Sequence, residues 1–207
     1  MYYPILLDLK GVPVLVVGGG RVALRKTRGL KECGARVRVV TLRAISEIKR
    51  MKGIRLEERG FRLSDLKGVR LVVAATSCGR TNRKISAACR SRGILVNVVD
   101  DRELSGFILP AVVRRGDLLI AVSTQGAAPF VAADIARGMR EKYGKDHALW
   151  LEKMRQARRT IMEKVASPAG RKRLLAELLK PTYFKMIEKG DMHAFDRRVE
   201  RLTDEAR

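Results

Sequence analysis

The sequence predicts an α/β fold that begins with a parallel sheet and ends in a helical region. Short apolar runs alternate with helical stretches as far as about residue 112, and such β-α-β repeats build a parallel sheet with helices on both faces. From residue 128 onward the pattern is helical nearly to the end. The 207 residues suit one such domain with an appendage, or two small domains.

The elements of the predicted sheet follow in order. VPVLVV over 12–17 is a continuous apolar run, typical of a strand buried on both faces. A helix over 21–32 follows it, and Gly34 can cap its end. The remaining predicted elements are a strand at 36–41, a short helix at 44–51, an edge strand at 54–58, a strand at 71–76, a basic helix at 80–92 and a strand at 94–99.

The pattern changes after the sheet. FILPAVV over 107–113 and LLIAVST over 118–124 predict two strands joined by a tight turn at 114–117. The apolar surface of this hairpin must be buried from solvent, and a second copy of the chain would bury it. In the helical region that follows, Pro168 and Pro181 are expected to separate the later helices. The predicted domains are an α/β domain at 1–112, a pairing segment at 113–144 and a helical C-terminal domain at 145–207.

Charge and composition narrow the classes of function. The net charge of +22 lies mostly in residues 1–144 and attracts anions: nucleic acid, acidic lipid or a polyanionic small molecule. A basic surface that is simply solvated is the open alternative. No run of 18 apolar residues is present, so no membrane span is expected, and the N-terminus does not read as a signal peptide. The three cysteines (Cys33, Cys78 and Cys89) lack metal spacing and indicate free thiols in a reducing cytoplasm.

The segment VLVVGGGRVALRKTRGL over 14–30 carries the first functional motif. Gly18, Gly20 and Ala23 occupy the three positions of G-x-G-x-x-G/A, directly after a predicted strand and at the start of a predicted helix. The helix N-terminus offers amide donors and a partial positive charge to a pyrophosphate. The motif therefore predicts a Rossmann-type dinucleotide site, and a purely structural turn is the alternative.

The end of the second strand leaves the choice of dinucleotide open. That strand usually ends in an acidic residue that holds the ribose hydroxyls. Here Thr41, Leu42 and Arg43 follow instead. Thr41 can hydrogen-bond a hydroxyl and Arg43 can hold a 2′-phosphate, so both NAD and NADP remain possible from the residues alone.

A second candidate lies in NVVDD, where a buried strand ends in Asp100 and Asp101. Carboxyl ends of parallel strands line the ligand crevice, so either acid can serve as a general base, a metal ligand or a turn cap. Asp100 is nearer the strand end and is the stronger candidate for chemistry. His147 and His193 lie in the helical part and are expected to be surface residues. The sequence contains no Ser-His-Asp arrangement and no cluster with metal-ligand spacing.

Four segments together resemble the precorrin-2 dehydrogenase family, the N-terminal module of siroheme synthase. They are PILLDLKGVPVLVVGGGRVALRKTRGLKECGARVRVV, LVVAATSCGRTNRKI, GILVNVVDD and FILPAVVRRGDLLIAVSTQGAAP. The resemblance covers residues 2 to about 143. It implies an NAD-binding Rossmann domain, a homodimer with exchanged elements, a helical domain, and oxidation of precorrin-2 to sirohydrochlorin with NAD as hydride acceptor. Some family members also insert a metal, as sirohydrochlorin ferrochelatases.

The resemblance also implies roles for individual residues. The implied pyrophosphate contacts are Gly18, Gly20, Arg21 and Val22. The implied adenosine contacts are Thr41, Leu42 and Arg43, and the implied nicotinamide contacts are Thr76 and Asn82. Asp100 falls on the catalytic aspartate. The sequence departs from the family pattern at Asp101-Arg102, where Asp-Pro is common, and at Gln125 and Ala128, which leaves fine substrate contacts open.

The implied substrate agrees with the charge. Precorrin-2 is a tetrapyrrole with eight carboxylates, and a basic cleft would raise its rate of encounter. Arg114 and Arg115 are the predicted substrate-binding residues, with Arg80, Arg83 and Lys84 as further candidates; simple solvation is the alternative for each. Metal insertion (Fe²⁺ or Co²⁺) at the same site would use Asp100. The alternative from another class is an NAD(H)-sensing regulator that binds nucleic acid through its basic face.

Overall fold

The computed structural model describes residues 2–206 and divides into two compact units, the first ending at Leu109 and the second beginning at Pro110. The division into 1–112, 113–144 and 145–207 stays a prediction, because the middle part was expected to form a dimer and this requires a second copy of the chain. Among residues 2–206, no helix combines the length and the apolar character needed to cross a bilayer.

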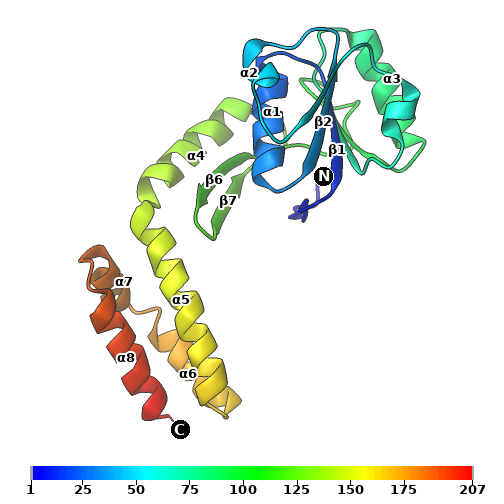
Figure 1. Cartoon of the computed structure of the whole chain (residues 1–207). Helices are drawn as coiled ribbons and strands as arrows, with labels where there is room; N and C mark the ends of the chain where they lie inside the picture. Colours follow the sequence, from blue (N-terminus) through cyan, green and yellow to red (C-terminus); the bar gives the residue numbers. More distant parts are fainter. Residues whose placement is uncertain (1, 207) are drawn as a thin grey trace. The chain divides into compact units, whose positions relative to one another are not determined.

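The first unit is a five-stranded, all-parallel sheet in the order β3-β2-β1-β4-β5, which confirms the predicted α/β fold. Helices cover both faces, with α1 on one side and α3 on the other (Figure 1). The strands are β1 (Pro13–Val17), β2 (Arg36–Thr41), β3 (Arg55–Glu58), β4 (Leu71–Ala74) and β5 (Leu95–Val98). The helices are α1 (Arg21–Glu32), α2 (Ser46–Lys49), the 3-10 helix η1 (Leu63–Leu66) and α3 (Gly79–Arg90).

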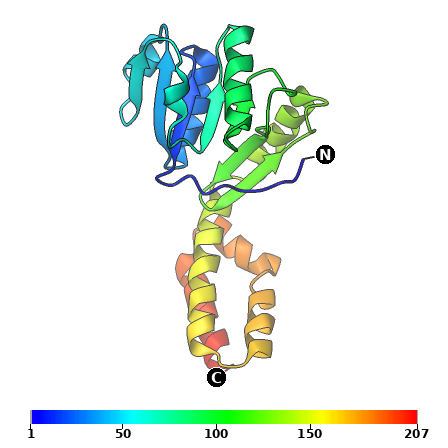
Figure 2. The ribbon, with the colours of Figure 1, turned by 90° about the vertical axis from the view of Figure 1, so that its right-hand side faces the viewer.

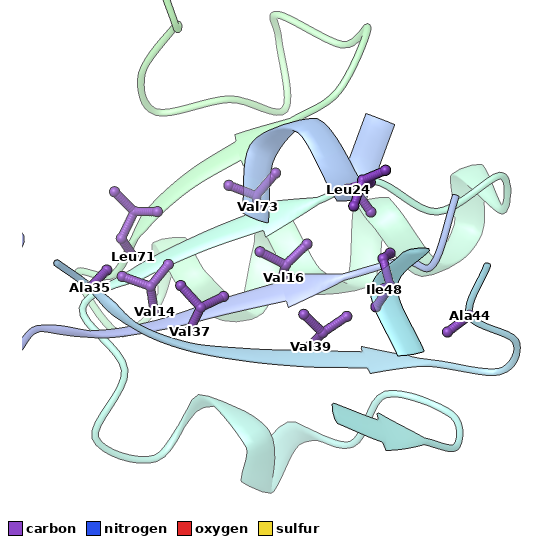
Figure 3. Close-up of a cluster of buried hydrophobic side chains, with 11 residues drawn as sticks. Val14, Val16, Leu24, Ala35, Val37, Val39, Ala44, Ile48, Leu71 and Val73 are labelled. Carbon is purple, nitrogen blue, oxygen red and sulfur yellow. The ribbon is translucent and has the colours of Figure 1, made fainter. Parts of the chain in front are cut away.

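Apolar side chains on both faces hold the sheet together, as the continuous apolar strands predict. On one face Val16 of β1 packs beside Val39 of β2 and Val73 of β4, under Leu24 of α1 (Figure 3). On the other face Ile85 of α3 packs on the alternate strand residues. Helix α1 ends where the sequence predicts: the amide of Ala35 donates to the carbonyl of Leu30, and Gly34 takes a φ of +77°. This is a Schellman end, which turns the chain directly into β2.

The second unit combines an antiparallel hairpin with five helices among the described residues. The elements are β6 (Ala111–Arg115), β7 (Leu118–Val122), α4 (Pro129–Lys142), α5 (Lys145–Lys164), α6 (Pro168–Glu177), α7 (Pro181–Glu188) and α8 (Met192–Asp204). Helix α5 runs beside α8 (Figures 1 and 2). Pro168 and Pro181 each take the first position of a helix, so the predicted separation is confirmed.

The predicted hairpin is present, but the predicted bounds of its first strand and of its turn are wrong. The first strand was expected at 107–113 with a turn from residue 114, whereas β6 begins after Pro110 and includes Arg114 and Arg115. Pro110 has no amide to donate, so pairing begins after it. The turn is reduced to two residues, and its first residue, Gly116, has a φ of +56°. Tight hairpin turns use a positive φ at this position, which glycine adopts at no steric cost.

Candidate functional site

The predicted site residues of the first unit gather at one edge of the sheet. The loops that follow β1, β2, β4 and β5 all leave the carboxyl ends of parallel strands. The central strand β1 has β2 on one side and β4 on the other, so the chain winds in opposite directions from it. This is the switch point at which open α/β sheets bind their ligands.

Tertiary packing explains two of the three glycines between β1 and α1. Gly18 has a φ of +132°, and a Cβ placed on it would lie 2.3 Å from the carbonyl oxygen of Ala75. A Cβ on Gly19 would lie 2.1 Å from the carbonyl oxygen of Arg43. Both positions therefore exclude a side chain for reasons of folding. The sequence motif did not single out Gly19, because its close neighbour comes from the loop after β2.

Gly20 is different, because a Cβ placed on it would meet no atom within 4 Å. It is the N-cap residue of the 12-residue helix α1, which has no side-chain cap and no acidic residue in its first turn. The amides of Arg21 and Val22 are therefore available to an anion, and the positive end of the helix favours one. The bare backbone at Gly20 lets a pyrophosphate approach these amides, so the residues present fit a dinucleotide.

The loop after β2 brings together the three predicted adenosine contacts. Thr41 is buried, and its hydroxyl donates to the carbonyl oxygen of Arg43 at 3.0 Å. Leu42 is 82% exposed and Arg43 is also exposed. An apolar side chain beside a basic one suits an adenosine, which has an apolar base and a polar ribose.

A carboxylate that the sequence did not point to lies beside this loop. Glu58, at the end of β3, pairs in register with Thr41. One of its oxygens accepts the Ala44 amide at 3.0 Å and the other lies 2.9 Å from Nζ of Lys49. The hydrogen bonds from Lys49 and from the Ala44 amide lower the pKa of the Glu58 carboxyl. An acid at the end of the predicted strand at 54–58 was the only available signal.

Thr76 and Asn82 form a reciprocal pair. The Thr76 hydroxyl donates to Oδ1 of Asn82 at 2.7 Å, and Nδ2 of Asn82 donates to the carbonyl oxygen of Thr76 at 3.0 Å. The pair ties the loop after β4 to the first turn of α3. The exposed thiol of Cys78 lies between them in the chain, and a hydrogen bond from the Thr81 hydroxyl lowers its pKa.

The two adjacent acids after β5 have different environments. Asp101 behaves as a turn cap, because its carboxylate accepts the amide of Leu104 at 3.0 Å and its carbonyl accepts the hydroxyl of Ser105 at 2.7 Å. Asp100 is exposed and has a φ of +62°, a left-handed conformation that Asp tolerates better than most residues. The structure thus shows the turn cap at Asp101 and leaves the Asp100 carboxylate exposed.

The Asp100 carboxylate interacts electrostatically with a cation of α1. Lys26 is half-buried, and both its burial and the charge of Arg25 lower the pKa of its ammonium group, while the Asp100 carboxylate opposes that shift. Val99, which precedes Asp100, packs in the same apolar cluster as Leu24 of α1. The sequence offered Lys26 only as one position in the periodicity of a helix.

The remaining predicted residues fall into two groups. Arg80, Arg83 and Lys84 are exposed at the start of α3, in the first unit. Arg114 and Arg115 belong to β6 in the second unit, where Arg115 donates to the carbonyl oxygens of Arg114 and Arg140. Their role toward the site of the first unit stays a prediction, as does the role of Asp100 toward a metal.

His147 corrects one expectation. It is half-buried, with its ring centroid 4.5 Å from that of Phe184 and 4.9 Å from that of Tyr143. It belongs to an aromatic cluster and is not a simple surface residue. His193 is exposed, as expected.

Comparisons with known proteins show the family of the chain. Residues 5–111 match a family described as putative NAD(P)-binding. The chain is 48% identical over 132 residues to the siroheme synthase of Ectopseudomonas mendocina, which covers 63% of this chain and 29% of that protein. It is 32% identical over 211 residues to the siroheme synthase of Sodalis glossinidius, which covers 98% of this chain and 44% of that protein. The chain thus spans less than half of these relatives.

A solved structure matches nearly the whole chain. The structure named SirC, precorrin-2 dehydrogenase, superposes with a TM-score of 0.82 at 27% identity. The match covers 97% of this chain and 100% of that one. The likeness therefore extends through the helical unit as well as the sheet.

Proposed function

The chain belongs to the family described as putative NAD(P)-binding, its cofactor is NAD, and we propose that it oxidises precorrin-2 to sirohydrochlorin. The observation that carries the proposal is the exposed carboxylate of Asp100, at the same sheet edge as the bare backbone of Gly20. The likeness to a precorrin-2 dehydrogenase over nearly the whole chain supports the choice of substrate.

In this proposal the residues of the first unit bind the cofactor and move one proton. NAD supplies the hydride acceptor. The first-turn amides of α1 hold the pyrophosphate, and the Thr76–Asn82 pair fixes the loop on the nicotinamide side. The macrocycle loses a hydride and a proton, and the Asp100 carboxylate takes the proton. Asp100 follows β5 in a left-handed conformation and precedes the turn that Asp101 and Ser105 close.

The charge of the protein supports an anionic tetrapyrrole as the substrate. Arg80, Arg83 and Lys84 lie exposed at the start of α3, and the net charge is +22. Guanidinium groups bind carboxylates through paired hydrogen bonds, so arginine suits a substrate rich in carboxylates. Lys26, which interacts electrostatically with Asp100, adds a cation on α1.

The test compares neighbouring acids. Asp100→Asn should reduce oxidation of precorrin-2 by about 10²- to 10⁴-fold, the usual contribution of a general base. Its affinity for NAD should stay within about threefold, because the pyrophosphate amides are unchanged. Asp101→Asn, which keeps an acceptor for the Leu104 amide, is the matched control and should retain activity. Formation of NADH fluorescence measures the reaction. Full activity in Asp100→Asn would remove the assigned role.

Metal insertion into sirohydrochlorin is a separate part of the proposal. The same carboxylate would accept the pyrrole protons that Fe²⁺ or Co²⁺ displaces. Purified sirohydrochlorin supplied with either ion should lose its absorbance faster with the protein than without it. Equal rates would limit the protein to the dehydrogenase step.

We also propose that the protein is a homodimer formed through residues 107–143. Several large apolar side chains of this segment are exposed, with Phe130 at 76% the most extreme. Exposed apolar surface of this kind is typical of protein interfaces. Light scattering at micromolar concentration should give the mass of a dimer, and a monomer would contradict this part of the proposal.

A further inference from the structure

We propose that Arg102 binds a carboxylate of the tetrapyrrole and that Tyr2 is the residue that positions it. This inference rests on the proposed function, because it concerns the substrate whose proton Asp100 takes. Arg102 stands two residues after Asp100, in the loop that follows β5. That loop leaves the carboxyl end of the sheet, where open α/β sheets bind their ligands.

The loop has an excess of acids, which repel a substrate rich in carboxylates. Asp100, Asp101 and Glu103 stand in a run of four residues, and Arg102 is the one cation among them. Asp100 and Glu103 are exposed, so both face an approaching anion through solvent. A cation in this loop therefore lowers the electrostatic cost of bringing an anionic macrocycle to Asp100.

Tyr2 holds the guanidinium group of Arg102 in one orientation. Nε of Arg102 donates to the Tyr2 hydroxyl at 3.2 Å, and Cζ of Arg102 lies 5.2 Å from the centre of the Tyr2 ring. A cation over the face of an aromatic ring is attracted to it, so the two contacts act together. Tyr2 is half-buried, whereas residues 3–8 after it are all exposed. The contact therefore orders a long, exposed side chain before a ligand binds.

The contact with Tyr2 leaves the other edge of the Arg102 guanidinium for a ligand. Tyr2 uses only Nε, and the two Nη groups remain. Among residues 2–206 they donate to no protein atom, the Asp101 carboxylate included, which accepts the Leu104 amide. Paired Nη donors match the two oxygens of a carboxylate. A guanidinium that is already held also loses less side-chain entropy when it binds.

The test separates binding from chemistry. Arg102→Ala should raise the KM for precorrin-2 by about tenfold and leave kcat within about twofold, because a contact made equally in the ground and transition states changes only KM. Tenfold is about the lower end for a hydrogen bond to a charged group, since Arg102 is exposed and solvent screens it. The dissociation constant of sirohydrochlorin, followed by its fluorescence, should rise by the same factor, while that of NAD stays unchanged.

Arg70→Ala is the matched control. Arg70 is an exposed arginine of the same unit that directly precedes β4, so it lies at the amino ends of the strands, on the edge of the sheet opposite Asp100. Each variant removes one positive charge from the +22 protein. An equal rise of KM in both would show that the general field attracts the substrate, and the inference would fail. Circular dichroism checks the fold, which should persist because neither side chain is buried.

The positioning role of Tyr2 has a readout of its own. Tyr2→Ala should raise the same KM by about threefold, the usual effect of an exposed cation–π contact, without a change in kcat. In an Arg102→Ala background it should add nothing, because Tyr2 acts only through the guanidinium. Tyr2→Phe keeps the ring and should recover part of the affinity. An equal effect of Tyr2→Ala in both backgrounds would overturn the positioning role.

The outcomes distinguish this inference from the proposed function. If the wild type oxidises precorrin-2 and Arg102→Ala has an unchanged KM, the inference fails and the proposed function stands. If the wild type oxidises no precorrin-2 but loses sirohydrochlorin affinity selectively in Arg102→Ala, the proposed function fails and the inference stands. If the wild type binds neither tetrapyrrole, both fail together.

Discussion

The two units of the chain are specified by different kinds of constraint. In the first unit, contacts with the backbone determine which residues fit in the loop after β1. Gly18 and Gly19 admit no side chain because carbonyl oxygens lie against them. In the second unit, an apolar cluster determines which residues fit, with Phe195 and Ile161 each 1% exposed. Backbone contacts require glycine, so they can be recognised in the sequence and indicate where a site lies. The apolar pattern of a helical core predicts only that the helices pack together.

Removing the core of the second unit is the largest change we predict. Phe195→Ala should reduce the stability of that unit by about 4 kcal/mol, the usual cost of deleting a buried aromatic ring. Trp150, the only tryptophan, packs against Phe184 in the same unit, so its fluorescence in urea reports the loss. NAD affinity, measured below the unfolding transition, should not change. A loss of NAD affinity in Phe195→Ala would contradict the expectation that the first unit binds NAD independently of the core of the second.

The second-largest predicted effect is a loss of stability when an ion cluster of the first unit is disrupted. Asp65 is 2% exposed and accepts two hydrogen bonds from Arg59, at 2.6 Å and 2.9 Å. The Arg59 guanidinium holds the pKa of Asp65 below its ordinary value. Asp65→Asn should reduce stability by about 2 kcal/mol at neutral pH, less than a fully buried pair would lose because Arg59 is partly exposed.

The pH dependence of that loss has a definite sign. A carboxyl whose pKa is lowered by folding contributes its full stability above the unfolded pKa of about 4. The contribution disappears as the pH falls from there through the folded pKa. Wild type and Asp65→Asn should therefore converge in urea unfolding below about pH 4, followed by far-UV circular dichroism. A constant difference at all pH values would show that the loss comes from packing alone.

The smallest effect we predict distinguishes a glycine that contacts the dinucleotide from a glycine that does not. Gly20→Ala places its Cβ in open space and should weaken NAD by about tenfold, because the methyl group occupies the approach to the amides. Gly29→Ala, inside the same helix α1 and also in open space, is the control. It should leave binding unchanged and raise stability by about 0.5–1 kcal/mol. Equal binding losses in the two variants would remove the distinction.

The sequence predicted the parts of the site that depend on local order along the chain. The loop after β1 follows from a strand, three glycines and a helix, and Asp100 follows from a strand end. The missing parts depend on neighbours distant in sequence. Gly19 is closed by the carbonyl of Arg43, and Glu58 is tied by the amide of Ala44. Lys26 comes within electrostatic range of Asp100 only because α1 packs on the sheet. Neither the apolar periodicity nor any motif predicts interactions between residues so far apart in the sequence.

The left-handed backbone at Asp100 has an evolutionary consequence. Aspartate and asparagine both tolerate this conformation, and their codons differ by one nucleotide. A single transition would thus replace the acid without straining the turn. Under the proposed mechanism, the descendant would still bind its dinucleotide but would lack the carboxylate that accepts the proton. Under the same proposal, one nucleotide change separates the enzyme from a protein that binds the dinucleotide without oxidising its substrate.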